Sequence, residues 1–287
     1  MARYCFAVNV VVEKHAKVRG SLGHLVTLSI EIAVSTMELQ DAAALVARMG
    51  LAQADVDVLI INQVESTPPP PQQQGRLRVY SFQERGLSRS RNHALDLARR
   101  DILVIADDDL EYQPGFETSV RAAFAAAPGA AILTFQFLDS DTNELAKKYS
   151  VRGHAHHRFS VPALTSMELA IRRSLLPRVH FDERFGLGAQ YPSGEEAIFV
   201  ADAMRAGAKA QYVPLVLCSH PGATTGHRSW GHGAATGKGA IVRRLFPRAW
   251  PLVLPAFVTA KLPLRDRQVP LVPWLIDFLQ GALELDR

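Results

Sequence analysis

Short apolar runs and segments of helical periodicity alternate along the first two-thirds of the chain. Runs such as VDVLIIN and DILVIA are rich in β-branched residues, which is typical of strands buried on both faces of a parallel sheet. The pattern predicts strands at residues 25–35, 56–62, 77–82, 101–106, 131–138, 166–173 and 210–220. It predicts helices at residues 37–50 and 88–100, one ending near residues 128–130, and one at residues 195–207.

Local signals mark the ends of these elements. Either Ser35 or Thr36 is expected to cap the first helix, and Gly50 to end it. The segment at residues 65–75 contains four consecutive prolines, which remove backbone donors, so we expect an irregular surface excursion. The strand at 131–138 alternates in polarity and is expected at an edge of the sheet.

The repeated strand–helix–strand pattern predicts an α/β fold with a mostly parallel, doubly wound sheet. In such sheets, ligands bind beyond the carboxyl ends of the strands, where Asn62, the GLSRSRN turn and Asp107 all fall. We expect residues 25–220 to form this α/β domain. Residues 221–287 would form a glycine-rich lid and a C-terminal helical extension, because six glycines between residues 221 and 239 are too many for a helix.

Composition narrows the class of protein. Hydrophobic residues make up 48% of the chain and charged residues 21%, so a folded core is expected rather than disorder. Cys5 and Cys218 are far apart, which argues against a disulfide framework or a zinc knuckle and suits a reducing cytosol. The start of the chain lacks a secretory cleavage pattern, and no apolar run has the length of a membrane span. We therefore expect a cytoplasmic protein, at most peripheral to a membrane.

Two polar motifs at strand ends are candidates for chemistry. Asp107, Asp108 and Asp109 directly follow a buried strand, where their carboxylates could share a divalent cation and so grip a diphosphate. The alternative is a solvated turn that caps the next helix.

GLSRSRN, residues 86–92, opens a helix where free backbone N–H groups favour phosphate. The alternative there is an ordinary helix start with surface arginines.

Four ordered features together resemble the family 2 glycosyltransferases, enzymes of the A-type glycosyltransferase fold. They are IAVST with its following helix, GLSRSRN, ADDDL, and SGEEAIFVADAMRAG leading to VPLVLCSH, and they cover residues 30–220. The resemblance implies that residues 25–220 bind a nucleotide sugar and catalyse its transfer. Several residues would line the nucleotide-sugar site: Ser35, Thr36, Asn62, Gly86, Ser88, Arg91, Asn92, Asp107 and Asp108.

The same resemblance assigns catalytic and metal-binding roles. Glu196 occupies the position of the family's general base, with Glu195 as its neighbour near the acceptor; the alternative is two exposed glutamates that favour a helix start. Asp109, Asp107 and His220 would hold the metal, Mn²⁺ or Mg²⁺. The family usually has an acidic residue after its second strand, where this chain has Asn62, and that departure leaves the base of the nucleotide open.

Other residues have weaker signals. Arg228 and Trp230 lie in the expected lid, where an arginine can meet phosphate and an indole can stack on a sugar. His154, His156 and His157 are close in sequence, but HAHH in a polar link is more often solvated than metal-binding. The tail mixes arginines with apolar residues, which permits contact with an anionic bilayer, although its prolines favour a packed subdomain.

The sequence thus predicts a metal-dependent, inverting glycosyltransferase of the hexosyltransferase type. It would move a sugar from a nucleoside diphosphate donor, with UDP favoured, to a hydroxyl acceptor such as a glycan or lipid-linked saccharide. A nucleotidyltransferase is the second hypothesis, although the lysine-bearing glycine loop it would need is not found after Ser35. The third is a catalytically silent module that binds sugar nucleotides or glycans. No nucleic-acid partner is expected.

Overall fold

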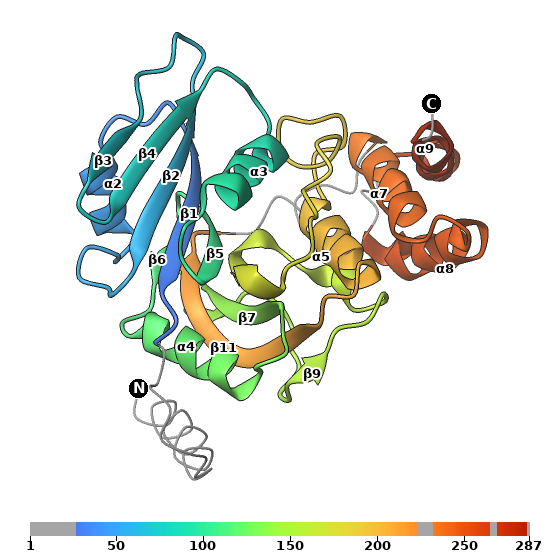
Figure 1. Ribbon diagram of the computed structural model, residues 1–287. Coiled ribbons are helices and arrows are strands. Elements are labelled where there is room, and N and C mark those ends of the chain that lie inside the picture. The colour runs from blue at the N-terminus through green and yellow to red at the C-terminus, as the bar shows by residue number, and fades with distance from the viewer. Residues whose placement is uncertain (1–26, 223–231, 265–268, 286–287) are drawn as a thin grey trace.

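The computed structural model describes residues 27–222, 232–264 and 269–285. Its centre is one mixed sheet with the strand order β3-β4-β2-β1-β5-β10-β7-β11-β6 (Figure 1). The principal strands are β1 (Ile30–Met37), β2 (Asp57–Gln63), β4 (Leu77–Phe82), β5 (Ile102–Asp107), β7 (Ile132–Asp139), β10 (Leu169–Arg172) and β11 (Ala210–His220). Short strands extend it at β3 (Gln72–Gln74), β6 (Glu111–Tyr112), β8 (Glu144–Leu145) and β9 (His154–Ala155).

The core of this sheet is parallel, as predicted. Strands β4, β2, β1 and β5 run in one direction, and β11 runs parallel to β7. Between these two groups lies β10, which is antiparallel to both β5 and β7. The prediction that the strand at 131–138 lies at an edge is therefore wrong, because β7 has neighbours on both sides and its apolar residues are buried.

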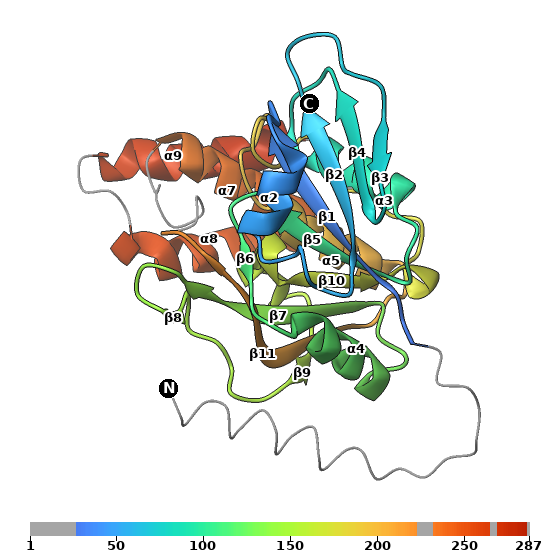
Figure 2. The ribbon, with the colours of Figure 1, turned by 90° about the vertical axis from the view of Figure 1, so that its left-hand side faces the viewer.

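Helices cover both faces of the sheet (Figures 1 and 2). They are α2 (Ala42–Arg48), α3 (Leu87–Leu97), α4 (Phe116–Ala126), α5 (Glu195–Arg205), α7 (His232–Leu245), α8 (Trp250–Lys261) and α9 (Leu271–Glu284), with 3₁₀ turns η1 (Val161–Ala163), η2 (Ser166–Glu168), η3 (Arg173–Leu175) and η4 (Leu262–Leu264).

Alternate residues of β1 enter two separate cores. Ala33 packs with α3 and α5, whereas Ile32 and Val34 pack with α2 and α4. This two-sided burial explains the continuous apolar runs of the central strands.

Two element ends differ from the predicted ones. Strand β1 continues through Ser35 and Thr36 to Met37, so neither of these residues caps the first helix. Asp41 caps it instead, with its side chain accepting a hydrogen bond from the backbone N–H of Ala44. The proline-rich excursion is not wholly irregular either, because β3 pairs with β4 in antiparallel fashion after the prolines end. Residues 72–74 form a strand because they pair with β4, and local sequence does not show such a partner.

The glycine-rich segment contains a helix, contrary to the prediction. Residues 232–239 form the first turns of α7, while residues 223–231, with Arg228 and Trp230, lie outside the described residues. A methyl group on Gly239 would lie 1.9 Å from the Phe278 carbonyl oxygen, and one on Gly281 would lie 1.9 Å from the Thr236 carbonyl oxygen. The glycines thus let α7 and α9 cross in backbone contact. Packing offsets their helix-propensity cost of about 1 kcal/mol each.

The C-terminal helices form a packed extension, as the prolines suggested. Trp274 and Phe278 of α9 are buried in the same hydrophobic core as α5 and α7. The opposite side of α9 is exposed and apolar. No helix in the described part of the chain is both long enough and apolar enough to cross a membrane.

Candidate active site

The predicted polar motifs converge at the carboxyl ends of the strands. Ser35 of β1 pairs in register with Asp107 of β5, so the ends of these two strands lie side by side. His220 ends β11, and α5 begins at Glu195. Because parallel strands finish at one edge of the sheet, residues more than one hundred positions apart come within hydrogen-bond distance there.

Arg91 connects the two acidic motifs of this edge. Its Nη2 donates to Asp107 Oδ1 at 3.0 Å, and its Nη1 donates to Glu195 Oε1 at 2.9 Å and to Glu196 Oε1 at 3.3 Å. The Arg91 side chain is only 1% exposed. The three carboxylates raise the pKa of Arg91 against the effect of its burial, so it is a permanent cation. Its guanidinium therefore organises carboxylates. Whether Arg91 also helps to hold a donor, as the resemblance implies, stays a prediction.

The two glutamates at the start of α5 differ in their surroundings. The Glu195 side chain is 4% exposed, and its Oε2 is buried without a hydrogen-bond partner among the described residues. The Glu196 side chain is 12% exposed. Burial, together with the charge of Glu195, raises the pKa of Glu196 to about 8, while Arg91 opposes this rise. Glu196 is thus the more accessible of the two and has a proton affinity suited to a general base.

Asp109 and His220 form the second pair of the site. His220 Nε2 lies 3.2 Å from Asp109 Oδ2, and its Nδ1 lies 3.3 Å from the Gly222 carbonyl oxygen. The hydrogen bond from His220, followed by its charge, outweighs partial burial and lowers the pKa of Asp109. The same pair raises the pKa of His220. Since a carbonyl oxygen only accepts, Nδ1 is the donor toward Gly222, and Nε2 faces the carboxylate.

The residues at this point fit part of a metal shell. A carboxylate oxygen and an imidazole nitrogen are both ligands that Mn²⁺ accepts. Asp107 is less suited to the predicted ligand role, because its Oδ1 accepts from Arg91 and its Oδ2 from Ser166 at 3.0 Å. In the described parts of the chain, no three His, Cys, Asp or Glu residues are grouped to hold a metal ion. An ion at Asp109 and His220 would need oxygens from a ligand or from water.

Asp108 fixes the acidic turn against β1. Its Oδ2 accepts a 2.5 Å hydrogen bond from Thr36 Oγ1, and its carbonyl oxygen accepts one from Arg48 at 2.8 Å. These bonds tie the end of β5 to the end of β1 and to α2. Asp109, by contrast, has a side chain that is 46% exposed. The turn therefore holds one carboxylate inward and leaves another facing the solvent.

Polar residues at the ends of β1 and β2 mainly hold the neighbouring turns. Ser35 Oγ accepts from Ser90 Oγ at 2.8 Å. Asn62 is buried, and its Oδ1 accepts from the Leu39 backbone N–H while its Nδ2 donates to Ser81 Oγ. These contacts shape the edge where the sequence predicts the nucleotide. Whether the same residues also touch a nucleotide stays a prediction.

The GLSRSRN segment uses much of its polarity to hold the loop at residues 181–188. The Leu87 N–H donates to the Leu187 carbonyl oxygen at 2.9 Å, and Ser88 Oγ donates to the Phe185 carbonyl oxygen at 2.5 Å. Asn92 exchanges two hydrogen bonds with the backbone of Phe181. The loop also approaches Gly86, because a methyl group on Gly188 would lie 3.3 Å from it. This helix start is therefore partly covered rather than an open phosphate cradle.

Two contributors were missed by sequence reasoning. Ser166 of η2 reaches Asp107 from a segment predicted as plain strand, and no local signal marks it. Lys238 of α7 lies beside the start of α5, with its Nζ 3.4 Å from Ser193 Oγ. Glycines flank Lys238, and they led to the prediction of a loop in which Lys238 had no role.

The histidine-rich link has a structural role. His156 Nε2 lies 2.7 Å from Thr134 Oγ1, and its Nδ1 lies 2.9 Å from Ser160 Oγ. Burial, followed by the neighbouring histidines, lowers the pKa of His156 to about 4. A neutral ring with both nitrogens engaged ties the link to β7. His154 and His157 are exposed, as expected of a solvated link, but His156 is partly buried.

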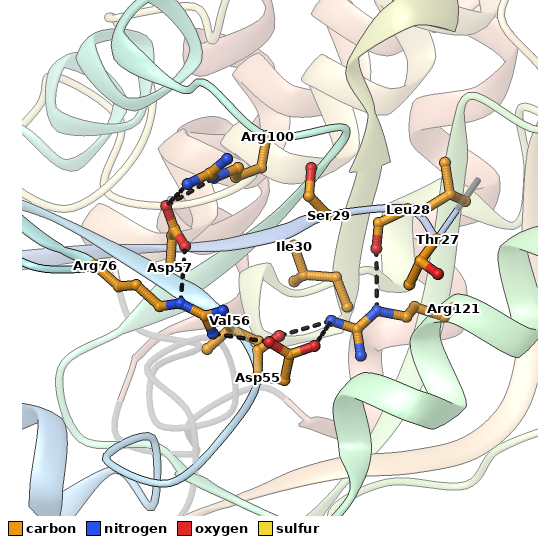
Figure 3. Close-up of a pocket in the computed structure, with 10 residues that line it drawn as sticks. All are labelled: Thr27, Leu28, Ser29, Ile30, Asp55, Val56, Asp57, Arg76, Arg100 and Arg121. Atoms are coloured by element: carbon orange, nitrogen blue, oxygen red, sulfur yellow. Dashed lines mark hydrogen bonds and ion pairs between the residues drawn. The ribbon is translucent and has the colours of Figure 1, made fainter.

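A hollow of about 180 Å³ lies at the other end of the central strands (Figure 3). Asp55, Asp57, Arg76, Arg100 and Arg121 line it, and each arginine is paired with an aspartate. The hollow lies at the amino ends of β1 and β2, away from the convergent carboxylates. Because every one of these arginines is already engaged by an aspartate, we interpret the hollow as part of the framework.

Known proteins resemble this chain in a sequence family and in fold. Residues 55–184 match the model described as Glycosyl transferase family 2, which confirms the family resemblance. A structure of S. aureus TarS has a TM-score of 0.60 and 13% identity, over 90% of this chain and 50% of that one. TarS 1–349 in complex with UDP-GlcNAc gives 0.60 and 13%, over 89% and 82%.

These neighbours confirm the A-type fold. At such low identity the likeness concerns the fold alone, and this chain spans half the length of the longer TarS structure. No curated protein matches the chain in sequence.

Proposed function

We propose that this chain, which carries a family 2 glycosyltransferase domain at residues 55–184, transfers a sugar from a UDP-linked donor to a hydroxyl acceptor with inversion. One observation carries the proposal: the exposed carboxylate of Asp109, paired with His220, and the carboxylate of Glu196 lie at the same edge of the sheet. Arg91 connects Glu196 to Asp107, two residues before Asp109. The choice of UDP is supported by the neighbour TarS, whose structure contains UDP-GlcNAc.

The donor would lie across the ends of β1 and β5, with its diphosphate near Asp109 and His220. When bound there, Mn²⁺ or Mg²⁺ would neutralise the negative charge that develops on the departing diphosphate. Asp109 and His220 would hold such an ion from one side and leave its other positions to ligand oxygens. Asp107, fixed by Arg91 and Ser166, would face the ribose.

Glu196 would act on the acceptor. Its carboxylate takes the proton of the acceptor hydroxyl as that oxygen forms a bond to the anomeric carbon, and the bond from this carbon to the diphosphate oxygen breaks on the opposite face. A single displacement of this kind inverts the anomeric centre. Glu195 would hold Arg91 rather than exchange protons, since it is buried and bonded to the guanidinium.

The first test is release of nucleoside diphosphate. The protein incubated with a UDP-hexose and Mn²⁺ is expected to release UDP, and to do so faster when a suitable acceptor is added. Release of pyrophosphate from a nucleoside triphosphate would instead support nucleotidyl transfer, and no release with any donor would support a silent binding module. With an α-linked donor, NMR of the product should show a β-linkage, and an α-linkage would refute inversion.

We also propose that the C-terminal extension contacts an anionic bilayer, where a lipid-linked acceptor would lie. The outer side of α9 exposes six large apolar side chains, namely Leu271, Val272, Leu275, Ile276, Leu279 and Leu283. The chain from Arg243 to Arg267 carries six basic residues and one acidic residue, which suits anionic lipid at the inner face of a membrane.

This contact is tested with vesicles. The protein should sediment with phosphatidylcholine–phosphatidylglycerol vesicles and less with phosphatidylcholine alone. A double variant, Ile276→Ser with Leu279→Ser, should lose sedimentation but keep donor binding, because both side chains lie on the exposed side of α9. If the parent protein instead forms a dimer that this variant dissociates, a second copy covers the face and the membrane proposal is wrong.

A further inference from the structure

Helix α7 presses directly on the start of α5, where the catalytic glutamates lie (Figure 1). A methyl group on Gly194, the residue before Glu195, would lie 2.4 Å from Cδ1 of Ile241. A methyl group on Gly237 would lie 3.8 Å from Pro192. The C-terminal extension is therefore seated against the residues that begin α5, with too little room for a side chain at position 194.

This packing of α7 places Lys238 close to the start of α5. Its Nζ lies 3.4 Å from Ser193 Oγ, just before the first turn of α5. Burial lowers the pKa of Lys238, whereas the charges of Glu196 and then Glu195 act in the opposite direction. A helix N-terminus ordinarily repels a cation, so the carboxylates are what stabilise an ammonium group at this position.

The local charges show why a second cation matters. The charges of Glu195 from its own helix, Arg91 from α3 and Asp107 from β5 act on Glu196, and the charge of Glu196 acts in turn on Lys238 of α7. Arg91 alone serves three carboxylates, and its contact with Glu196 is the longest of the three at 3.3 Å. Like charges that share a buried site favour retention of a proton on one of them. An ammonium group beside Glu196 favours the ionised form that a base requires.

We propose that Lys238 is a positioning residue, delivered by α7, that stabilises Glu196 as the carboxylate and so makes the C-terminal extension part of the catalytic site. This inference rests on the proposed function, in which Glu196 is the base. It also adds a residue of α7, in the C-terminal extension, to a site whose other members come from residues 35–220.

The pH dependence of transfer tests the proposal. A base must be ionised, so kcat/KM rises with pH through the pKa of Glu196 in the free enzyme. Lys238→Met removes a cation, raises that pKa and should move the acidic limb upward by about 1 pH unit. Lys238→Arg should restore the limb toward its original position. Lys209→Met, at an exposed lysine after α5, should leave it unchanged.

A second measurement does not depend on turnover. In protein labelled with ¹³C at the glutamate side-chain carboxyl, Glu196→Gln identifies the Glu196 resonance by its loss. Its titration midpoint should rise in Lys238→Met and return in Lys238→Arg. An unchanged midpoint and an unchanged pH profile in folded Lys238→Met would refute the role of Lys238. A raised midpoint in a protein that releases no nucleoside diphosphate would show that the proposed function fails while the electrostatic inference holds.

Discussion

Glu196→Gln is expected to reduce sugar transfer by roughly 10² to 10⁴, the usual contribution of a general base. The amide has nearly the shape of the carboxylate and can keep an oxygen toward Arg91 Nη1, which contacts Glu196 Oε1 in the parent protein. It cannot take a proton from the acceptor hydroxyl. Affinity for the donor and for Mn²⁺ should remain, because Glu196 is on a different element from Asp109 and His220. Single-turnover transfer and calorimetric binding of UDP separate these two effects.

Two matched variants control this experiment. Glu195→Gln should lower transfer less, because Glu195 is buried against Arg91 and is less exposed than Glu196. Glu144→Gln changes an exposed glutamate in β8 and should leave transfer unaltered. A fully active Glu196→Gln enzyme would reject Glu196 as the base. A larger loss in Glu195→Gln than in Glu196→Gln would move the assignment to Glu195.

Asp109→Asn is expected to abolish the metal-dependent part of donor binding. The change replaces a charged oxygen ligand with a neutral one, and the ion would have only His220 as its other side-chain ligand in the described site. UDP affinity with Mn²⁺ should therefore fall to the value measured without metal. Titration calorimetry of UDP in Mn²⁺ and in chelator gives both values for each variant.

His220→Ala should weaken metal affinity less than Asp109→Asn, since it leaves the charged ligand in place. Asp141→Asn, the same substitution in an exposed turn after β7, serves as the control and should bind UDP and Mn²⁺ as the parent does. Unchanged Mn²⁺ dependence and unchanged nucleotide affinity in Asp109→Asn would overturn the metal assignment. If His220→Ala lowers only the melting temperature, His220 is a structural residue.

Local patterns predicted the strands and helices well where the pattern was long. β4 has the predicted bounds, Leu77–Phe82, and β2, β5 and β11 lie within a residue or so of their predicted ranges. For β2 and β5 the reason is burial on both faces, which requires continuous apolar runs that can be recognised without knowing the partner strand. The local pattern did not predict where a strand lies within the sheet. The central place of β7 depends on β10 inserting beside it, which is a long-range event.

The site was predicted in outline rather than in its contacts. The motifs correctly indicated one edge of the sheet, because strand ends are local features. The partners of Arg91 were not predictable, since Asp107 and Glu195 lie 16 and 104 positions from it. A guanidinium is attracted equally to phosphates and to carboxylates, so sequence alone could not choose between them. In the folded chain Arg91 is buried and its guanidinium contacts carboxylates.

The sequence by itself determined the α/β class, the parallel core and the resemblance to the family 2 glycosyltransferases, because periodicity and motif order are properties of the linear chain. Tertiary structure alone decided which polar groups are buried in contacts with the framework and which remain exposed at the edge of the sheet. It also decided that the glycine-rich stretch at residues 232–239 is helical. Glycine weakens an isolated helix, but contact between α7 and α9 at Gly239 and Gly281 reverses that preference, and α7 places Lys238 next to Ser193, just before α5.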